Sequence, residues 1–392
     1  MPFAAGRDND RVTPDYTGGG LLNLMASLEA ACGGTPAAPP ATLLPPARLA
    51  GRRNVVLVIV DGLGARYLAT RGAGSALARH LRGTLTSVFP STTASAVTTT
   101  LTGRAPAEHG LTGWHLWLPE TGAITAVLPQ KARDGSPLLP TDPAALFPCD
   151  SFFNRIARPA YVVSPQAIID TVFNTRHCGR AAKVPYAASA DFFPAVARTL
   201  RATTEPSFIY AYTPDFDALA HAHGVGSAEA AREFAALDAA WKTFLEQIAG
   251  TDTVVVLTAD HGFIDAPAEH LIDLDAHPRL TALLARPLCG ERRVAYCYVK
   301  AGADAEFRRY VASELLHATE LIPREALLAS GWFGPGPAHP QLASRIGDYA
   351  LVMRGDWTIK DWVPGEKRHP MIGVHAGLTA DEMLIPLVFA ET

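Results

Sequence analysis

Four short stretches of the sequence combine aspartate and histidine, the side chains that most often hold transition metals. They are, in chain order, a lone carboxylate after an aliphatic run (Asp61), D-A-L-A-H (Asp217 to His221), D-H-G (Asp260 and His261) and G-V-H-A-G (His375). Imidazole and carboxylate together suit zinc, and manganese or iron less selectively. Three Asp and three His are enough for two sites of three protein ligands, each with an open position for a substrate.

Each stretch alone is weak evidence for a metal. A carboxylate at the end of a strand is more often a turn residue, and a histidine in a loop is more often an ordinary surface or core residue. The four stretches together are harder to explain by structure alone, because the first three each follow a run of residues typical of a buried strand.

Those runs span residues 54–60, 207–213 and 253–259 and are rich in β-branched and aliphatic side chains. Continuous apolar runs are typical of parallel strands buried on both faces. In open parallel sheets the ligand site lies beyond the carboxyl ends of the strands. Apolar residues at spacings of three and four predict a helix over 228–249. We therefore expect an α/β fold: a central, mostly parallel sheet flanked by helices, with inserted cap segments.

Differences in composition along the chain indicate how it is organised into an arm, a catalytic domain and cap insertions. Residues 1–53, rich in Ala, Gly and Pro, are expected to form an N-terminal arm with a short helix over 21–31. Residues 54–392 are expected to form one catalytic domain with cap insertions near 115–200 and 265–345. The caps should wall the metal site, and an aromatic cluster in them could stack on a flat substrate group or simply pack; it comprises Trp114, Trp117, Phe152 and Phe153.

Composition excludes several classes of protein. The net charge of -4 and a pI near 6.3 do not indicate a stable nucleic-acid partner. No apolar run is long enough to cross a membrane, and the N-terminus has no signal-peptide core, so a cytoplasmic protein is expected, or a periplasmic one if a signal has been removed. Five cysteines without C-x-x-C spacing indicate buried free thiols, with a Cys289–Cys297 pair as the alternative. The oligomeric state is left open.

The stretch from Val88 to Gly103 carries a hydroxyl on eight of its sixteen residues and no charge. A helix is expected from Thr93 onward, and a threonine at a helix start can be an ordinary cap. A metal ion at the same place would instead lower the pKa of the hydroxyl and make it a nucleophile. The helix N-terminus would also favour a phosphoryl anion.

In this order, the motifs V-V-L-V-I-V-D-G, T-G-R-A-P-A-E-H-G-L, T-P-D-F-D-A-L-A-H-A-H-G, T-A-D-H-G and G-V-H-A-G resemble the alkaline phosphatase superfamily, and within it the nucleotide pyrophosphatase/phosphodiesterase branch. The resemblance implies an alkaline phosphatase-like core and a Ser or Thr nucleophile beside one metal of a zinc pair. In that family the nucleophile lies ten residues before the Gly of a T-G pair, here Gly103, which points to Thr93. Thr92 and Ser91 remain the alternatives.

Carried over to this chain, the resemblance implies two divalent ions, with Zn²⁺ preferred over Mn²⁺ or Fe. It implies that the first ion is held by Asp217, His221 and His375, and the second by Asp61, Asp260 and His261 beside Thr93. His223 is not expected to be a ligand.

One departure from the family concerns the phosphoryl oxygens, which an Asn usually binds a few residues after the H-G step. Here Trp114 stands near that position and is the candidate substrate-binding residue. Arg104 and Lys131 are candidate replacements for the missing donor. The segment Lys367-Arg-His369 either binds a substrate anion or is a solvated loop.

The expected function is a dinuclear phosphodiesterase or nucleotide pyrophosphatase that forms a covalent phosphothreonine and acts on a small phosphate ester or nucleotide. A phosphomonoesterase or phosphonate hydrolase on the same scaffold is the alternative. A sulfatase lacks support because no C/S-x-P-x-R motif is present. A phosphoglycerate-type mutase would need a Ser nucleophile and another anion cradle, and a non-catalytic binding module would have lost a ligand.

Overall fold

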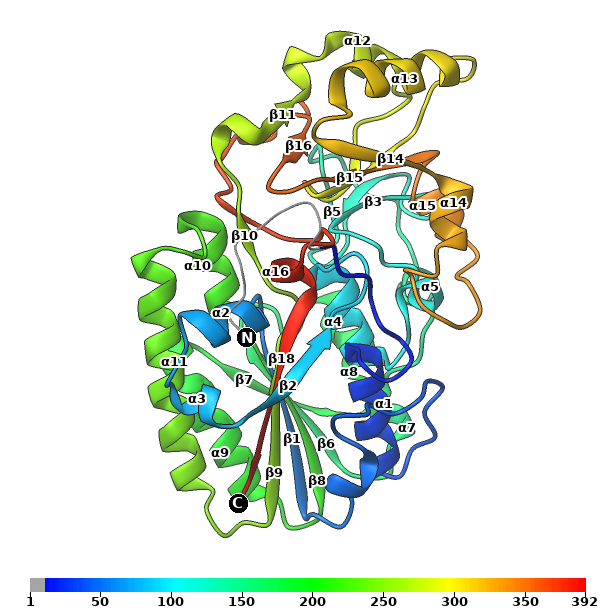
Figure 1. Ribbon diagram of the computed structural model, residues 1–392. Coiled ribbons are helices and arrows are strands. Elements are labelled where there is room, and N and C mark those ends of the chain that lie inside the picture. The colour runs from blue at the N-terminus through cyan, green and yellow to red at the C-terminus, as the bar shows by residue number, and fades with distance from the viewer. Residues whose placement is uncertain (1–10) are drawn as a thin grey trace.

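A seven-stranded sheet forms the larger part of the molecule in the computed structural model, which describes residues 11–392 (Figure 1). Its strands, in spatial order, are β2 (Leu81–Thr86), β18 (Leu384–Glu391), β9 (Thr253–Thr258), β1 (Asn54–Val60), β8 (Ser207–Thr213), β6 (Ala160–Pro165) and β7 (Ala182–Tyr186). Strand β1 lies between β8 and β9 and runs parallel to both, whereas β18 is antiparallel to β9. The predicted α/β fold with a mostly parallel sheet is confirmed.

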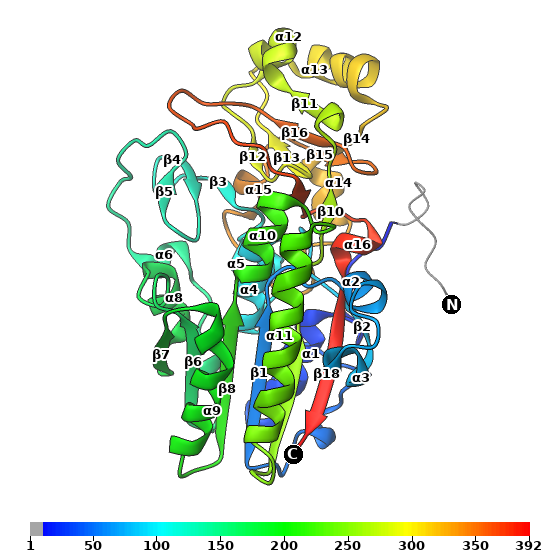
Figure 2. The same cartoon turned by 90° about the vertical axis from the view of Figure 1, so that its left-hand side faces the viewer.

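Helices cover both faces of this sheet, which is why β1, β8 and β9 are buried along their whole length and read as continuous apolar runs (Figures 1 and 2). On one face lie α1 (Leu21–Ala31), α4 (Thr93–Thr102), α7 (Phe152–Arg155) and α8 (Val172–Cys178). On the other lie α2 (Ala65–Thr70), α3 (Ala76–Arg79), α9 (Phe192–Ala202), α10 (Asp215–His223) and α11 (Ala228–Gln247). The predicted helix over 228–249 is thus α11.

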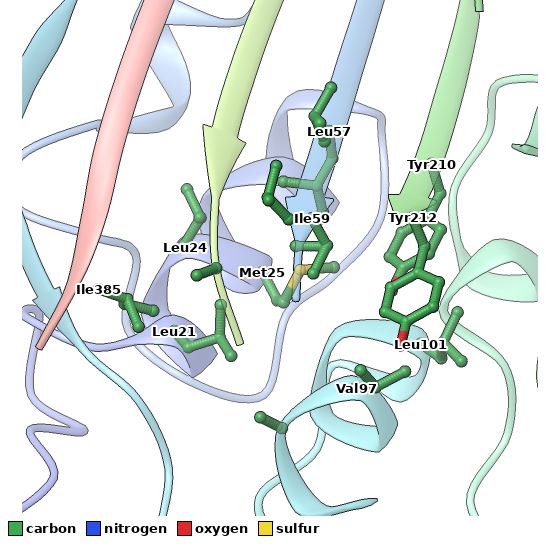
Figure 3. Close-up of a cluster of buried hydrophobic side chains, with 14 of the residues drawn as sticks. Leu21, Leu24, Met25, Leu57, Ile59, Val97, Leu101, Tyr210, Tyr212 and Ile385 are labelled. Atoms are coloured by element: carbon green, nitrogen blue, oxygen red, sulfur yellow. The ribbon is translucent and has the colours of Figure 1, made fainter. Parts of the chain in front are cut away.

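The predicted N-terminal helix exists as α1, but it is part of the core. Leu21, Leu24, Met25 and Leu28 are fully buried, and their spacing of three and four residues makes one apolar face. Figure 3 shows side chains of α1 gathered beside β1, with those of α4 beside β8. Residues 21–31 therefore belong to the main domain rather than to a separate arm. Residues 1–10 of the predicted arm lie outside the described residues.

A second seven-stranded sheet forms a cap beyond the carboxyl ends of β1, β8 and β9 (Figure 1). Its strands, in spatial order, are β14 (Thr319–Pro323), β15 (Tyr349–Met353), β13 (Val294–Cys297), β12 (Cys289–Gly290), β3 (His115–Leu118), β4 (Ala123–Ala126) and β5 (Lys131–Ala132). The short pairs β10 (Ile264–Asp265) with β17 (Gly373–Val374) and β11 (Leu271–Asp273) with β16 (Thr358–Lys360) are additional. The remaining α-helices are α5 (Pro106–His109), α6 (Pro143–Leu146), α12 (Pro278–Leu283), α13 (Asp304–Tyr310), α14 (Arg324–Ala329), α15 (Leu342–Arg345) and α16 (Ala380–Met383).

The predicted cap boundaries are wrong in two places. Residues 152–200 belong to the main domain, because α7, β6, α8, β7 and α9 lie there. They were misassigned because β7 is an edge strand with an internal Pro185 and exposed positions, so it lacks the continuous apolar run of a central strand. The second cap segment extends past 345, because β15 belongs to the cap sheet, where it lies between β14 and β13.

The predicted aromatic cluster does not form. Phe152 and Phe153 are fully buried in the main domain, where both rings pack against Phe208. Trp117 lies beneath the guanidinium of Arg286 in the cap. Of the four predicted members, only Trp114 lines the cavity at the site described below.

A buried ion pair ties the cap to the core. Arg293, next to β13, donates from Nε and Nη2 to the carboxylate of Glu382 in α16, at 3.0 and 2.9 Å, and neither side chain is exposed. Glu382 also accepts a hydrogen bond from the backbone N–H of Gly377 at 2.7 Å. One carboxylate thus holds both the start of β13 and the turn after His375.

Two predictions about the whole chain can be compared with the structure. All five cysteines lie among the described residues and each is a free thiol, so Cys289 and Cys297 do not pair. Within residues 11–392 no helix combines the length and the apolar character that crossing a membrane requires.

Candidate metal centre and active site

The six predicted ligands converge where β1, β8 and β9 end. Asp61 directly follows β1, helix α10 with Asp217 and His221 follows β8, and Asp260 and His261 come two and three residues after the end of β9. His375 follows β17 from the far end of the chain. Parallel strands point their carboxyl ends to one edge, so segments 150 or more residues apart meet there.

One group of three consists of Asp61, Asp260 and His261. Nε2 of His261 lies 3.3 Å from Oδ1 of Asp61 and 3.4 Å from Oδ2 of Asp260. All three residues are buried, and their ligand atoms lie within 4.8 Å of one another. This is the set that the resemblance implies for the second ion.

The other group surrounds Asp217. Its Oδ1 lies 3.5 Å from Nε2 of His221 and 3.9 Å from Nε2 of His375, and the two imidazole nitrogens are 3.2 Å apart. Nε2 of His261 also lies 3.9 Å from the same oxygen of Asp217, and Asp217, His261 and His375 form a second compact group. The two sets of ligands therefore adjoin each other, as a pair of neighbouring ions requires.

Three carboxylate oxygens in this cluster have no hydrogen-bond partner in the described part of the chain: Oδ1 of Asp61, Oδ1 of Asp217 and Oδ2 of Asp260. Leaving a buried polar oxygen unsatisfied costs about 1–3 kcal/mol, and more for a charged group. All three face imidazole nitrogens of the same cluster. These donors fit divalent cations, which would satisfy every one of them.

Each of the three histidines is oriented by its other ring nitrogen. Nδ1 of His221 lies 2.9 Å from the carbonyl of Gly373, Nδ1 of His375 lies 3.2 Å from that of Ser91, and Nδ1 of His261 lies 3.1 Å from that of Gly262. A carbonyl can only accept, so each Nδ1 carries a proton and each Nε2 faces the cluster. Ligating histidines in metal sites are fixed in this way.

The other carboxylate oxygens of Asp61 and Asp260 are held by the protein. Tyr212 donates its hydroxyl to Oδ2 of Asp61, and Oδ1 of Asp260 accepts from the backbone N–H groups of Gly62 and His261 at 3.1 and 3.0 Å. Gly62 has a φ of 75°, and a Cβ there would come within 2.4 Å of the Phe263 ring. The D-G step after β1 thus needs glycine for the turn that brings this N–H to Asp260.

Crowding of like charges shifts the pKa values of these groups. Burial, reinforced by Asp61, raises the pKa of Asp217 well above its usual range and that of Asp260 to about 8. Burial lowers the pKa of His261, but Asp260 and Asp61 outweigh it and raise that pKa to about 10. Burial lowers the pKa of His221 to about 4. Without a bound cation, ionisation of the buried carboxyl groups in this cluster therefore costs free energy.

The three candidate hydroxyls face different partners. Thr93 is the first residue of α4, and its Oγ1 lies 3.2 Å from Nε2 of His261. Thr92 donates its hydroxyl to Glu291 at 2.6 Å, and Ser91 donates to the carbonyl of Gly377 at 2.8 Å. Of the three, Thr93 is therefore the one whose hydroxyl contacts the ligand cluster.

A cavity of about 370 Å³ opens between the ligand cluster and the cap. The main domain contributes Thr92, Thr93 and the ligands Asp217, His221 and His375, and the cap contributes Trp114, Glu291 and Arg292 among others. The predicted contact of the cap with the site is thus present. This volume is at the lower end of the usual range for small-molecule sites.

Several polar residues of this cavity were not predicted from the sequence. Glu291 accepts hydrogen bonds on Oε1 from Thr92 and from the backbone N–H of Trp114, the latter at 2.7 Å. Burial raises the pKa of Glu291 to about 7. The cap also supplies the cations Arg133, Arg292 and Lys360.

The predicted anion-binding candidates lie elsewhere. Arg104 follows the C-terminal end of α4, a helix of ten residues and thus about 15 Å long, whereas Thr93 begins it. Lys131 is exposed on the edge strand β5 of the cap, and neither residue lines the cavity. Of the segment 367–369, only His369 lines the cavity, while Arg368 pairs with Asp273 and Asp275. His223 is exposed, as expected for a residue that is not a ligand.

Comparison with known proteins agrees with the fold and the motifs. Residues 55–376 match the family model of type I phosphodiesterase / nucleotide pyrophosphatase, so the chain belongs to that family. Its members hydrolyse phosphoric esters, and this chain is accordingly an enzyme of that class. None of the curated proteins matches the chain in sequence.

Solved structures of related fold include two from mammals and one from a bacterium. Human ectonucleotide pyrophosphatase / phosphodiesterase 5 is 19% identical, with a TM-score of 0.60 over 85% of this chain and 87% of that one. The murine enzyme is 18% identical, with a TM-score of 0.56 over the same shares. Phosphonoacetate hydrolase from Sinorhizobium meliloti, in complex with phosphonoacetate, is 20% identical, with a TM-score of 0.61 over 86% and 90%. At these identities the likeness concerns the fold.

Proposed function

We propose that the chain is a phosphodiesterase that uses two divalent ions, with zinc preferred, and Thr93 as the nucleophile. The observation that carries the proposal is the cluster of three unsatisfied carboxylate oxygens and three oriented imidazoles beside the Thr93 hydroxyl. Asp61, Asp260 and His261 would hold one ion, and Asp217, His221 and His375 the other. The ions would supply charge neutralisation and a lowered pKa for the hydroxyl.

The protein's own groups account for binding and attack. The first N–H groups of α4 have no intrahelical partner and point toward the start of the helix, where they can donate to phosphoryl oxygens. The Thr93 oxygen would bond to phosphorus as the ester oxygen leaves, and hydrolysis of the phosphothreonine would regenerate the hydroxyl. One related structure supports this role: an inactive murine ectonucleotide pyrophosphatase / phosphodiesterase 5, in which a threonine is replaced by alanine, in complex with AMP.

Glu291 favours a diester over a monoester. Its carboxylate lines the cavity and binds Thr92, the neighbour of Thr93, and the backbone N–H of Trp114, so it lies on the side of the cavity where a phosphoryl group would enter. A phosphodiester carries one negative charge and a monoester carries about two at neutral pH. A fixed carboxylate at this place repels the dianion more strongly.

We therefore expect Glu291→Gln to raise the ratio of monoester to diester hydrolysis by about tenfold, because one like charge is removed while the acceptor for Trp114 stays. The ratio is measured with p-nitrophenyl phosphate and bis(p-nitrophenyl) phosphate at about pH 8.5, where Glu291 is ionised. An equal loss on both substrates would mean that Glu291 only supports Thr92 and Trp114.

Phosphonate hydrolysis is the second candidate. The observation in its favour is the likeness in fold to a phosphonoacetate hydrolase that was solved with phosphonoacetate. Release of inorganic phosphate from phosphonoacetate, compared with release of p-nitrophenol from the diester on the same batch of protein, decides between the two. Phosphate release without diester hydrolysis would overturn the phosphodiesterase proposal.

A further inference from the structure

The cap side of the cavity carries three cations, and two of them are already neutralised. Arg133 donates from Nη2 to Asp361 at 2.8 Å and to Glu366 at 3.0 Å, and its side chain is 4% exposed. Lys360 donates to the other oxygen of Glu366 at 2.6 Å. Two carboxylates therefore balance these two cations, and neither cation needs a substrate.

Arg292 is different. Within residues 11–392 its side chain has no carboxylate partner: the one hydrogen bond of the guanidinium runs from Nη2 to the carbonyl of His369 at 3.4 Å, and the guanidinium lies 5.7 Å from the centre of the Trp362 ring. It is half-buried and lines the cavity. A guanidinium keeps its charge under all physiological conditions, so Arg292 presents to the cavity a positive charge that is not paired with a carboxylate. Glu366 acts on this charge from a distance, but both of its oxygens are already bound by Arg133 and Lys360.

The backbone at Arg292 is held firmly. Its neighbour Arg293 is locked by the buried pair with Glu382, and its own carbonyl accepts from the N–H of Ile359 at 2.9 Å. Its other neighbour, Glu291, is tied to Thr92 and Trp114. Arg292 therefore starts from a fixed point in the cavity wall, which lowers the entropy lost when its side chain binds a ligand.

We infer that Arg292 binds a second anionic group of the substrate, a phosphate or a carboxylate, while the reacting phosphoryl group lies at Thr93. This inference rests on the proposed function and makes it more specific: the preferred substrates would be phosphodiesters or pyrophosphates with an additional negative charge beyond the ester being cleaved. Arginine suits the task because its planar fork can donate two parallel hydrogen bonds to phosphate or carboxylate. Two adjacent residues would then both select the substrate: Glu291 would act on the reacting phosphoryl group, and Arg292 would bind the second anionic group.

The test uses three p-nitrophenyl phosphodiesters that share a leaving group and differ in the end of the second ester chain: methyl, carboxylate or phosphate. The wild-type enzyme should prefer the anionic tails by about tenfold or more in kcat/KM. Arg292→Gln should reduce that preference to about one, chiefly through KM, and Arg292→Lys should keep part of it. The carboxylate and phosphate arms show which anion is preferred.

A matched control is Arg286→Gln. Arg286 is another half-buried cap arginine, stacked between Trp117 and Tyr298, but it does not line the cavity. Its replacement should leave the preference for anionic tails in place. If Arg292→Gln and Arg286→Gln act alike, or if the wild-type enzyme shows no preference for an anionic tail, the inference is wrong.

A binding measurement separates this inference from the proposed function. Calorimetric titration of the same three esters into the Thr93→Ala variant gives dissociation constants without turnover. Tighter binding of the anionic esters by tenfold or more, lost on adding Arg292→Gln, would support the role of Arg292 even if the wild-type enzyme hydrolysed none of them. Equal binding of all three esters would overturn it even if the enzyme were an active diesterase.

Discussion

Thr93→Ala is expected to lower turnover of a phosphodiester by about a thousandfold or more, because the covalent route through its hydroxyl is lost. The six side chains that would hold the metals remain, so the variant should bind about as much metal as the wild-type protein. Thr93→Ser keeps a hydroxyl at the same helix start and should keep part of the activity. The measurement is kcat on bis(p-nitrophenyl) phosphate, with metal content determined on each variant.

The neighbouring hydroxyls provide matched controls. Thr92→Ala loses a hydrogen bond to Glu291 and Ser91→Ala loses one to the Gly377 carbonyl, and each should cost only about 1 kcal/mol. If Thr92→Ala were inactive and Thr93→Ala active, the nucleophile would be Thr92. If all three variants were active, the hydroxyls would be structural and water would attack the phosphorus directly.

Asp260→Asn is expected to have opposite effects on activity and on the stability of the metal-free protein. Activity should fall by about a thousandfold, because one charged ligand of the metal site is lost. The amide keeps the acceptor for the N–H groups of Gly62 and His261 but removes a buried charge beside Asp61. Metal-free Asp260→Asn should therefore unfold at a higher temperature than metal-free wild type at about pH 8.

The higher unfolding temperature expected for Asp260→Asn follows from the pKa of Asp260, which burial raises in the folded protein from 3.8 to about 8. A carboxyl with a raised folded pKa adds no penalty below pH 3.8, and its destabilisation grows as the pH rises toward 8. The metal-free wild type should thus lose stability across this window, and Asp260→Asn should lose less. Thermal unfolding in chelator at several pH values measures both effects.

Asp215→Asn is the control, since Asp215 lies after the carboxyl end of β8, at the same edge of the sheet as Asp260, and accepts from Thr213, but is not among the predicted ligands. It should change neither activity nor the pH dependence by a comparable amount. If Asp260→Asn remained fully active, Asp260 would not be a ligand. If it lowered the stability of the metal-free protein at pH 8, its carboxylate would act as a structural acceptor.

The central strands could be predicted from the sequence because of where they lie. Strands β1, β8 and β9 are covered by helices on both faces, so each is a continuous apolar run that ends beside a predicted metal ligand. Strands β6 and β7 stand toward the edge of the same sheet, and the exposed positions of β7 and its Pro185 imitate a loop. This is why the sequence alone places residues 152–200 in the cap.

The ligand cluster could be predicted for a similar reason: three of the four predicted ligand motifs come after the central strands β1, β8 and β9, and only His375 follows the short strand β17 outside that sheet. No comparable sequence motif identifies the cavity residues of the cap. Glu291 lies about 200 positions from Thr92 in the sequence, and only the packing of the cap against the core brings them together. The side-chain environment that selects a substrate therefore had to come from the structure.

The position of the nucleophile could be predicted only in part from the sequence, less well than the ligand motifs and better than the cavity residues of the cap. The sequence narrowed it to three adjacent hydroxyls, and the position of the helix start separates them in space. Thr92 has an extended backbone as the N-cap of α4, and the next residue, Thr93, turns toward His261. A shift of one residue at a helix start rotates a side chain by about 100°, so a small uncertainty in the boundary decides which hydroxyl meets the ligands.

The metal content of the purified protein shows whether the chain is a dinuclear metalloenzyme. The metal content of protein purified without chelator is determined by elemental mass spectrometry. Any vacant site is then titrated with zinc or manganese. We expect about two divalent ions per chain, with zinc bound more tightly than manganese, and fewer ions in Asp260→Asn. Protein that contains no metal, and binds added zinc and manganese only weakly while still hydrolysing a phosphodiester, would contradict this expectation.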